Sequence, residues 1–558
     1  MAGLLPPRPT YEDCYAQFRW QIPEHFNIAS VVCDRHAAAN PERPAIIFEG
    51  VGGGEQRLSF GDLRTQANRL ANVLTHFGVR RGQRIAIHLP QSFEAAVAHI
   101  AIYKVGAIAL PLFSLFGPDA LRHRLVDSGA QVLITCSDNL AVLGTIEDDL
   151  GELAHVLVTD GSAARAQDLR VLMASASDAF ETVTTRADDP AMLIYTSGTT
   201  GDPKGALHAH RVLLGHMPGV EFPQRYFPQP GDLFWTPADW AWAGGLLDVL
   251  LPSLFHGIPV LAKRFAKFEP EAVFRLMAKH GVRNTFMPAT ALRMLRQYPN
   301  PEKFAIKLRS VASGGEALGE DLVDWGRETL GVTINEFYGQ TEVNLVVGNN
   351  ADVMPTKPGS MGRPIPGHDV SIINENGREV ATGEIGMVAV RRPDPVMFIE
   401  YWNNPEATRA KFIDDWCLLG DLAWRDDDGY FWFKSRDDDV IISSSYRIGP
   451  TEVEECLVRH PKVVMAGVIG SPDPVRGEIV KAYVVLRDDV LTGENTATEE
   501  VVREEIQAFV KRELSAHEYP RKIQFIDELP LTVTGKIQRV RLRERDAAER
   551  QALFQQQD

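Results

Sequence analysis

The sequence predicts an α/β protein with a large N-terminal domain and a small α+β C-terminal domain. Its 558 residues exceed what one hydrophobic core usually supports, so two or more domains are expected. Before residue 434, short apolar runs alternate with helical patterns, which favours layered α/β subdomains with largely parallel sheets. The charged segment SRDDDVI (residues 435–441) then marks a junction, and we place the domains at 1–437 and 438–558.

Short apolar runs predict the strands of the N-terminal domain. They predict buried strands at residues 84–89, 107–113, 131–136 and 191–195. Between residues 359 and 390 the pattern changes to short strands separated by the turn signals NENG (374–377) and ATGE (381–384). This change indicates a smaller β-rich subdomain.

The C-terminal domain carries helix and strand signals of its own. We expect helices at residues 450–459 and 499–514, strands at 464–470 and 481–487, and a helical or frayed tail at 544–558. These elements are typical of a small α+β domain.

Composition excludes several classes of function. The formal charge of −16 argues against a general nucleic-acid binder, because a phosphate backbone requires a basic surface. The longest apolar stretch, at residues 241–261, is interrupted by Asp248, Pro252 and His256, so no membrane span is expected. Five cysteines without CxxC or metal-ligand spacing fit reduced thiols in the cytoplasm. Self-association into a homo-oligomer is left open.

The loop TSGTTGDPKG (residues 196–205) predicts a phosphate site. Its glycines allow backbone N–H groups to approach an anion, its hydroxyls add donors, and Lys204 adds a positive charge. The loop follows the predicted strand at 191–195, and α/β folds often place ligands at such a strand end. It is not a Walker loop, because Gly205 follows the lysine where Ser or Thr would be needed.

Four further motifs follow this loop along the chain. They are GGEAL (314–318), EFYGQTE (336–342), LLGDLAW (418–424) with KSRDDDVI (434–441), and LPLTVTGKIQR (529–539). With these motifs in this order, nearly the whole chain resembles the AMP-forming acyl-CoA synthetases of the adenylate-forming superfamily. The resemblance implies two half-reactions with ATP, Mg²⁺ and coenzyme A: a carboxylate first attacks the α-phosphate of ATP, and the thiol of coenzyme A then displaces AMP.

The resemblance also implies which residues bind ATP. The β- and γ-phosphates would contact Thr196, Ser197, Gly198, Thr199, Thr200, Gly201 and Lys204. The adenine and α-phosphate segments would be Gly315, Glu316, Ala317, Glu336, Phe337, Tyr338, Gly339, Gln340 and Thr341. Asp421 would accept the ribose hydroxyls, and Arg436 and Arg447 would face the ribose or phosphates.

Three residues are expected to act in catalysis by the same resemblance. Glu342 would hold the Mg²⁺ ion, because a hard cation favours oxygen ligands. Lys204 would stabilise the leaving pyrophosphate, and Lys536 would bridge the attacking carboxylate and the α-phosphate. The C-terminal domain would turn about a hinge at Asp438 between the half-reactions, after which Ser444, Ser445 and Tyr446 would line the coenzyme A channel. Many relatives carry glycine where Ser445 stands.

The acid itself is less defined. Trp240, Trp242, Gly244 and Gly245 match the wall of the family's acyl pocket, although core tryptophans would explain the same pattern. Acetate-specific relatives carry tryptophan where Gly339 stands, so we expect an acid longer than acetate: short-to-medium-chain, branched or aromatic. His208 and His210 are a poor ligand set and are expected to be structural.

Three alternatives remain at this stage. An aryl-CoA ligase for benzoate-type acids would need a flat, wider slot. An enzyme that loads a carrier protein would not respond to free coenzyme A. A catalytically silent nucleotide-binding protein is ranked last, because it would have lost Lys536 or Glu342 and both are present.

Overall fold

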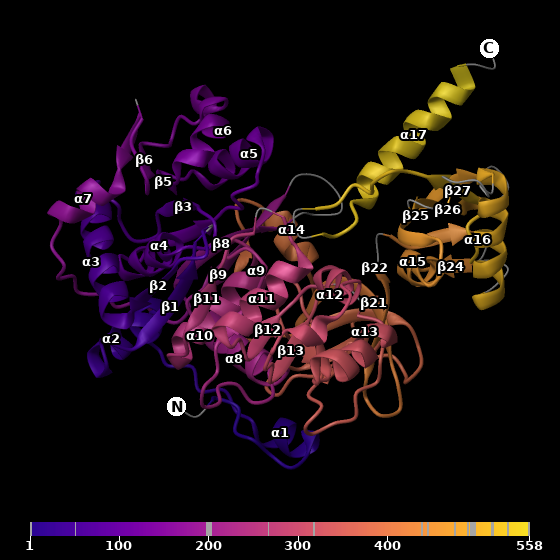
Figure 1. The fold of residues 1–558 in the computed structure, drawn as a ribbon, viewed down its shortest axis with the longest axis horizontal. Coiled ribbons are helices and arrows are strands. Elements are labelled where there is room, and N and C mark those ends of the chain that lie inside the picture. Colours follow the sequence, from indigo (N-terminus) through magenta and orange to yellow (C-terminus); the bar gives the residue numbers. More distant parts are fainter. Residues whose placement is uncertain are drawn as a thin grey trace. The chain divides into compact units, whose positions relative to one another are not determined.

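The computed structural model has two compact units. The first contains the described residues up to Val370 together with Val390–Cys417, and the second contains Ser371–Ala389 and the described residues from Leu418 onward. The structure describes residues 3–50, 52–163, 165–196, 203–265, 267–315, 318–436, 439–443, 446–473, 476–487, 490, 498–514, 518–532 and 535–555. Sheets and helices alternate along the first unit (Figure 1), so the predicted α/β class is confirmed.

A nine-stranded sheet forms one half of the first unit. Five pairs of neighbouring strands are parallel: β1 with β11, β11 with β10, β10 with β12, β12 with β13, and β13 with β14. Strand β2 at one end of the sheet and strands β15 and β16 at the other end pair antiparallel. In spatial order the strands are β16 (Arg363–Pro364), β15 (Val347–Gly348), β14 (Ile334–Tyr338), β13 (Ser310–Ser313), β12 (Asn284–Phe286), β10 (Phe234–Trp235), β11 (Val260–Ala262), β1 (Pro44–Glu49) and β2 (Glu55–Ser59).

An eight-stranded sheet forms the other half. Its strands are parallel from β8 to β7, and β9 and β19 are antiparallel. In spatial order they are β19 (Glu400–Tyr401), β9 (Lys204–Ala209), β8 (Pro190–Thr196), β4 (Ile108–Pro111), β3 (Arg84–His88), β5 (Val132–Thr135), β6 (His155–Val158) and β7 (Ala166–Asp168). The four strands predicted from apolar runs are β3, β4, β5 and β8, so those predictions are confirmed.

Two helices connect the sheets. Helix α3 (Phe60–His76) packs against β1 and β2, α4 (Phe93–Lys104) packs against β3 and β4, and the two helices pack on each other. Helix α3 begins where the Ser59 side chain and Asp62 form a capping box, which satisfies free N–H groups of its first turn. Helix α4 is buried on all sides, as its apolar sequence requires.

The remaining helices of the first unit pack against the sheets or lie in the segments that connect the strands (Figure 1). Apolar side chains of α11, α12 and α13 pack on the nine-stranded sheet around Trp235, Val311 and Ile334. The helices are α1 (Tyr11–Gln17), α2 (Arg35–Ala39), α5 (Pro118–Ser128), α6 (Leu140–Gly144), α7 (Leu169–Ser175), α8 (Val212–Glu221), α9 (Ala243–Gly245), a π-helical segment (Leu246–Leu250), α10 (Leu251–His256), α11 (Pro270–His280), α12 (Ala289–Arg296), α13 (Glu320–Trp325) and α14 (Pro405–Ala410).

The expected short strands of the β-rich segment form a separate five-stranded sheet. Its order is β17 (Val370–Ile373), β18 (Gly386–Arg391), β21 (Trp416–Arg425) and β20 (Phe412–Ile413), with β22 (Phe431–Arg436) also paired to β21. Both expected turns are present: Gly377 N–H donates to the Asn374 oxygen at 3.0 Å, and Glu384 N–H donates to the Ala381 oxygen at 3.0 Å.

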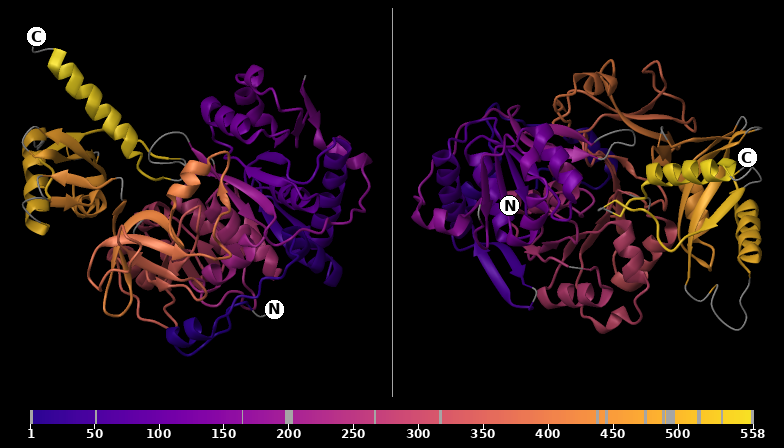
Figure 2. Two further views of the ribbon diagram at one scale, coloured as in Figure 1. Left: turned by 180° about the vertical axis from the view of Figure 1, so that it is seen from behind. Right: turned by 90° about the horizontal axis from the view of Figure 1, so that it is seen from above.

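The rest of the second unit is an α+β fold. Helices α15 (Pro450–Val458) and α16 (Glu499–Glu513) pack on one face of a sheet and α17 (Arg539–Gln555) begins on the other (Figure 2). Alternate residues of β26 separate the two faces, with Ala482 on the first and Tyr483 on the second. The strands are β24 (Tyr446–Ile448), β23 (Ile441–Ser443), β26 (Gly477–Leu486), β25 (Val463–Asp473) and β27 (Lys522–Phe525). The helices and strands expected here, including a helical tail, are confirmed.

Candidate active site

Several predicted residues lie at one edge of the nine-stranded sheet. Strands β13 and β14 are parallel neighbours, with Ser313 opposite Glu336. Because their carboxyl ends reach the same edge, Gly315 and the segment from Tyr338 to Thr341 come together there. Gly315 has φ 90°, a conformation that glycine adopts without strain. This edge of the sheet therefore combines two of the five sequence motifs.

Glu342 is a buried carboxylate beside this edge. It is 5% exposed, and the hydroxyl of Tyr401 donates a hydrogen bond to its Oε1. Its backbone oxygen accepts from the N–H of Phe398 at 2.8 Å. Tyr401 belongs to β19, so a strand of the eight-stranded sheet fixes the carboxylate in position.

Lys204 lies near the ring of the same tyrosine. Its ammonium nitrogen is 5.6 Å from the centre of the Tyr401 ring, within reach of a cation–π attraction. Lys204 begins β9 and pairs with Thr196, the last residue of β8, so the predicted phosphate loop is the connection of this hairpin. The ring of Tyr401 therefore connects the predicted phosphate-binding lysine to the predicted magnesium ligand.

Gly339 is required by a close backbone contact. A Cβ atom at this position would clash with the backbone nitrogen of Leu345 and lie 2.8 Å from two backbone atoms of Asn344. Leu345 itself has φ 55°, which is rare for a bulky residue and costs energy. The backbone of Asn344 and Leu345 thus occupies part of the space that a larger side chain at position 339 would fill. The sequence analysis, which compared Gly339 with the tryptophan of acetate-specific relatives, did not show this.

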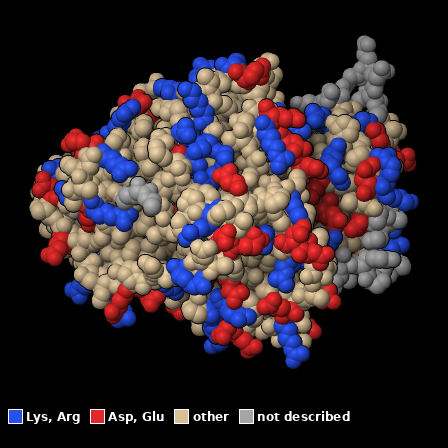
Figure 3. Space-filling view, turned by 90° about the horizontal axis from the view of Figure 1, so that it is seen from below, with Lys and Arg blue, Asp and Glu red and all other residues tan. Residues whose placement is uncertain are grey.

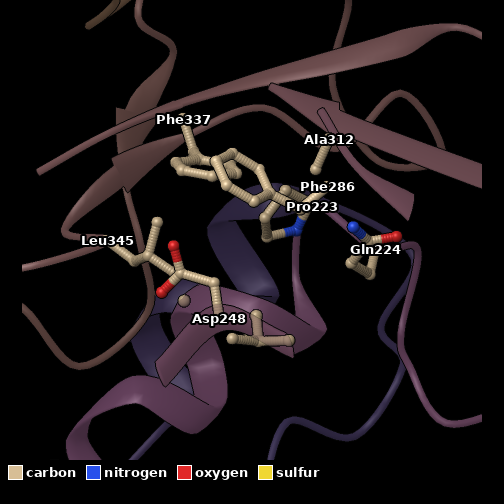
Figure 4. A pocket seen from close by; sticks show the side chains of 9 residues that line it. Pro223, Gln224, Asp248, Phe286, Ala312, Phe337 and Leu345 are labelled. Carbon is tan, nitrogen blue, oxygen red and sulfur yellow. The ribbon is translucent and has the colours of Figure 1, made fainter. Parts of the chain in front are cut away.

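A small cavity lies behind Leu345 (Figure 4). Its volume is about 10 Å³, room for about one water molecule. Two aromatic rings, Phe286 and Phe337, face each other beside it with centroids 5.3 Å apart. The lining residues are Gly219, Val220, Pro223, Gln224, Asp248, Phe286, Ala312, Phe337 and Leu345.

Two of the residues predicted to form the acyl pocket pack against Phe286, which lines this cavity. Trp242 packs on Phe286 with ring centroids 5.6 Å apart, and Gly244 lies so close to both rings that a Cβ would be 2.7 Å from Phe286. Gly245 is held against the backbone oxygen of Asp239, and Trp240 is a buried core residue. Phe337, expected in the nucleotide segment, directs its ring toward the cavity (Figure 4).

In the second unit, Asp421 and Arg436 contact each other directly. They are register partners on β21 and β22, and Arg436 Nη1 is 3.1 Å from Asp421 Oδ1. Asp421 is 3% exposed, so this ion pair keeps a buried carboxylate compensated. The two residues expected to face the ribose are thus neighbours.

Lys536 is exposed on a tight hairpin. Its backbone N–H donates to Thr532 Oγ1 at 3.0 Å, its oxygen accepts from Thr532 N–H at 2.7 Å, and Leu531 pairs with Ile537 across the hairpin. Gly535 completes the turn with φ 87°. The turn therefore presents the lysine side chain at the surface of the second unit.

An ion-pair cluster that sequence reasoning missed holds the base of this hairpin. Arg539 donates to Asp439 Oδ2 at 3.0 Å and to Glu454 Oε2 at 2.5 Å, and Arg543 also pairs with Asp439. Asp439 and Glu454 are 6% and 8% exposed. The sequence shows Asp439 beside the predicted hinge and Arg539 three positions after Lys536. Because the two residues are 100 positions apart, the sequence does not show that they pair.

Other predicted residues lie outside the described residues. These are Ser197, Gly198, Thr199, Thr200, Gly201, Glu316, Ala317, Asp438, Ser444 and Ser445. Tyr446 and Arg447 are placed as backbone in β24, opposite Ser443 and Ile442.

The two histidines after the phosphate loop are buried in β9. Burial lowers the pKa of His208 to about 3 and that of His210 to about 4, so both are neutral at physiological pH. The N–H of Ile28 donates to His210 Nδ1 at 3.2 Å. This environment agrees with the structural role expected for them.

The residues present fit a Mg²⁺ ion that is shared with phosphates. Within the described ranges, no group of three or more His, Cys, Asp or Glu side chains could hold a metal by itself. Magnesium is commonly bound by one or two carboxylates together with substrate phosphates, and Glu342 supplies such an oxygen. The five cysteines are all buried as free thiols, so the expected absence of a disulfide framework is confirmed.

Charge is mixed over the face that Figure 3 draws, where lysines and arginines are interspersed with acidic side chains. None of the helices in the described part of the chain combines the length and apolarity needed to cross a bilayer.

Comparison with known families gives a match in each part of the chain. The AMP-binding enzyme family matches residues 33–402, and the AMP-binding enzyme C-terminal domain matches residues 452–536. The first match includes Lys204, Gly339, Glu342 and Tyr401, and the second ends at Lys536.

Individual relatives cover almost the full length. The acetyl-coenzyme A synthetase of Bacillus subtilis (strain 168) is 35% identical over 95% of this chain and 94% of its own. The mitochondrial acyl-coenzyme A synthetase ACSM3 of Mus musculus is 34% identical over 96% of this chain and 93% of its own. The crystal structure of the anthranilate CoA ligase AuaEII in complex with anthranoyl-AMP matches with a TM-score of 0.85 and 27% identity, over 95% of this chain and 98% of that one.

Proposed function

The chain belongs to the AMP-binding enzyme family and is an AMP-forming ligase that uses ATP to join a carboxylic acid to coenzyme A, and from this premise we propose that its acid is a short-to-medium-chain, branched or aromatic monocarboxylate activated at the carboxyl edge of the nine-stranded sheet. The observation that carries the proposal is the row Lys204, Tyr401 and Glu342, which ends at a residue of the same motif as Gly339.

The reaction has two steps. A carboxylate oxygen attacks the α-phosphorus of ATP, the bond to the β-phosphate oxygen breaks, and pyrophosphate leaves. The sulfur of coenzyme A then attacks the acyl carbon, the acyl–phosphate bond breaks, AMP leaves, and the thiol proton passes to solvent. The acid needs no general base, because a carboxylic acid is already ionised at neutral pH.

The chain's own residues stabilise negative charge in the first step. Lys204 balances the charge that collects on the leaving pyrophosphate, and Tyr401 contacts Glu342 through its hydroxyl and Lys204 through its ring. Mg²⁺ bound to Glu342 would supply further neutralisation of the phosphates. Lys536 brings the carboxylate and the α-phosphate together against their repulsion.

The second step is proposed to use another face of the C-terminal domain. The domain boundary at 437/438, with the hinge at Asp438, would allow Lys536 to withdraw and Ser444, Ser445 and Tyr446 to line the path of coenzyme A. We place the enzyme in the cytoplasm, because its five cysteines are free thiols.

An aromatic acid is the second candidate for the substrate. Phe286 and Phe337 border the cavity with their ring centroids 5.3 Å apart, so the remote edge of an aromatic acid would meet aromatic side chains there. The anthranilate CoA ligase shares the fold over nearly the full chain, which supports the same candidate.

The experiment measures release of AMP and pyrophosphate with Mg-ATP and a series of acids. The series runs from acetate to decanoate and includes benzoate, each with and without coenzyme A. We expect AMP formation that depends on coenzyme A and is greatest for an acid longer than acetate. Pyrophosphate exchange that coenzyme A does not affect would instead indicate a carrier-protein acceptor, and no turnover with any acid would contradict the proposal.

A further inference from the structure

Asp248 is an isolated acid at the wall of the cavity. It lies in the π-helical segment and is 4% exposed, and its carboxyl group points toward the ring of Phe337 (Figure 4). Asn344 Nδ2 donates to its Oδ1 at 2.7 Å. Within the part of the chain that the structure describes, Oδ2 has no hydrogen-bond partner.

The neighbouring polar groups are already committed. His216 Nδ1 donates to the Val212 oxygen at 2.8 Å, so its Nε2 is the acceptor for Asn344 Nδ2 at 3.1 Å. The amide nitrogen of Asn344 therefore uses both of its hydrogens, one on His216 and one on Asp248. This chain of hydrogen bonds fixes the direction of each donor and ends at Asp248.

Gln224, the second polar residue of the lining, is hydrogen-bonded through both of its amide atoms. Its Nε2 donates to the Thr285 oxygen at 3.0 Å, and its Oε1 accepts from Ser310 Oγ at 2.5 Å. The rest of the lining is apolar side chains and backbone. Among the polar side-chain atoms of the lining, Asp248 Oδ2 is thus the one without a hydrogen bond to the described residues.

No positive charge in the described surroundings compensates Asp248. Burial raises its pKa well above the ordinary value for aspartate, and burial lowers the pKa of His216 to about 4, so that ring is neutral. Burial therefore favours the protonated, neutral form of this carboxyl group. Because Oδ1 accepts from Asn344, the acid proton belongs on Oδ2, where it can be donated into the cavity.

We propose that Asp248 determines the specificity of the acyl pocket by hydrogen-bonding an uncharged hydroxyl group at the end of the acid remote from its carboxylate. This inference rests on the proposed function, since it assumes that the acid enters beside Gly339. A hydroxyl oxygen is the size of a water molecule, which matches the cavity volume of about 10 Å³. The hydroxyl also offers both a lone pair and a hydrogen to the carboxyl group.

A methyl group or an ammonium group fits this position less well. A methyl group would leave the buried donor unsatisfied, which lowers affinity by roughly 10- to 100-fold. An ammonium group would require Asp248 to ionise in a mostly apolar site, and the desolvation of both charges opposes that pairing.

The test compares acids in which a methyl group replaces the hydroxyl. The pairs are 3- and 4-hydroxybenzoate with the corresponding methylbenzoates, and 4-hydroxybutanoate with pentanoate; 4-aminobutanoate supplies the ammonium group. For each acid, kcat/KM of AMP formation is measured with Mg-ATP and coenzyme A. We expect at least one hydroxy acid to exceed its methyl partner by roughly 10- to 100-fold.

Two variants of Asp248 test whether a hydrogen-bond donor at this position causes the hydroxyl preference. Asp248→Asn keeps a donor at the same place, so the hydroxyl preference should persist. Asp248→Leu removes it, so the preference should reverse. Asp239→Asn changes a half-buried carboxyl group that does not line the cavity and should give the wild-type ratio. Thermal unfolding of each variant shows whether it has folded.

The outcomes distinguish this inference from the proposed function. Turnover of some acids without any hydroxyl preference in the wild-type enzyme would overturn the role of Asp248 alone, and it would indicate a carboxyl group that holds a structural water. Preference for 4-aminobutanoate, lost in Asp248→Asn, would also overturn it in favour of an ionised carboxylate. Absence of turnover with every acid would contradict the proposed function itself.

Discussion

Two regions that carry predicted catalytic residues are constructed in opposite ways. At the carboxyl edge of the nine-stranded sheet, Glu342 is buried and held by Tyr401 and by the backbone of Phe398. In the second unit, Lys536 is exposed on a hairpin, and buried ion pairs of Arg539 hold the base of that hairpin.

This difference corresponds to the roles proposed for the two regions. Groups that bind the nucleotide throughout both half-reactions benefit from fixed positions, which burial and hydrogen bonds provide. A lysine needed only in the first half-reaction benefits from an exposed hairpin that buried ion pairs stabilise, because the hairpin can then move as a rigid unit. The predictions below test the two constructions separately.

The largest expected effect is on the exposed lysine. Lys536→Ala should lower the rate of acid-dependent ATP–pyrophosphate exchange by roughly 100- to 1,000-fold, because one preorganised charge at the reacting phosphate is lost. Its stability should not change, since the side chain is exposed. Lys522→Ala, another exposed lysine of the second unit, is the control and should retain full exchange. An equal loss in both variants would contradict a specific role for Lys536.

The base of the hairpin should respond in the opposite way, through stability. Arg539→Ala leaves Glu454 without its arginine partner and Asp439 with Arg543 alone, and removal of one partner from a buried ion pair costs about 3–5 kcal/mol. Denaturant unfolding measures this change. The control Arg541→Ala removes an exposed arginine of the same helix and should change stability by less than about 0.5 kcal/mol. If Arg539→Ala unfolds like the wild type, the cluster does not hold the hairpin.

A smaller effect is expected in the buried region. Tyr401→Phe keeps the ring that Lys204 faces but removes the hydrogen bond to Glu342, so the apparent affinity for Mg-ATP should fall about tenfold, as expected for a hydrogen bond to a charged group. Titration of the exchange rate with Mg-ATP measures it. Tyr15→Phe removes a hydroxyl that donates to the His368 backbone oxygen and serves as the control. Similar Mg-ATP dependence in both variants would argue against a role for Tyr401.

The effect expected at the cavity is a pH dependence, which is small for each single pH unit. Because the pKa of Asp248 is raised on folding, the folded chain holds a proton that the unfolded chain loses above pH of about 4. The contribution of Asp248 to the free energy of unfolding is therefore greatest at low pH and decreases as the pH rises toward the folded-state pKa. Asp248→Asn cannot lose a proton, so its stability relative to wild type should increase with pH by at most about 1.4 kcal/mol per unit.

Unfolding at several pH values between 4 and 8 tests this dependence. His216, Asn344 and Gln224 also face Asp248, and burial keeps His216 neutral over most of this range. Asp148→Asn removes an exposed carboxyl group and should show no such trend. A stability difference between Asp248→Asn and wild type that is independent of pH would show that Asp248 is ionised in the folded protein.

Much of the fold was predictable because its signals are local. The apolar runs that predict β3, β4, β5 and β8 need only a few residues each, and helices α15 and α16 follow from their own apolar pattern. The family resemblance, now confirmed by the family matches, rested on motifs of ten or so residues. For the same reason Lys204, Glu342 and Lys536 can be singled out from the sequence alone.

The partners of these residues could not be predicted, because they are distant in the chain. Tyr401 lies 59 positions after Glu342, and Arg539 lies 100 positions after Asp439. The apolar run at 241–261 drew attention to Asp248 as an interruption, but nothing in the run names Asn344, 96 positions away, as its hydrogen-bond donor. A sequence lists potential donors and charges without their partners.

The sequence by itself determined the family and the two half-reactions, and it supplied the candidates for the charged groups that act on phosphate, since each depends on the kind of residue in a short motif. The tertiary structure alone decided the packing of the region proposed for the acyl end. There, the Leu345 backbone occupies space beside Gly339, two aromatic rings from different strands meet, and an aspartate keeps one oxygen without a partner among the described residues. Packing and hydrogen-bond satisfaction are properties of atoms brought together across the chain, and the folded structure is needed to show them.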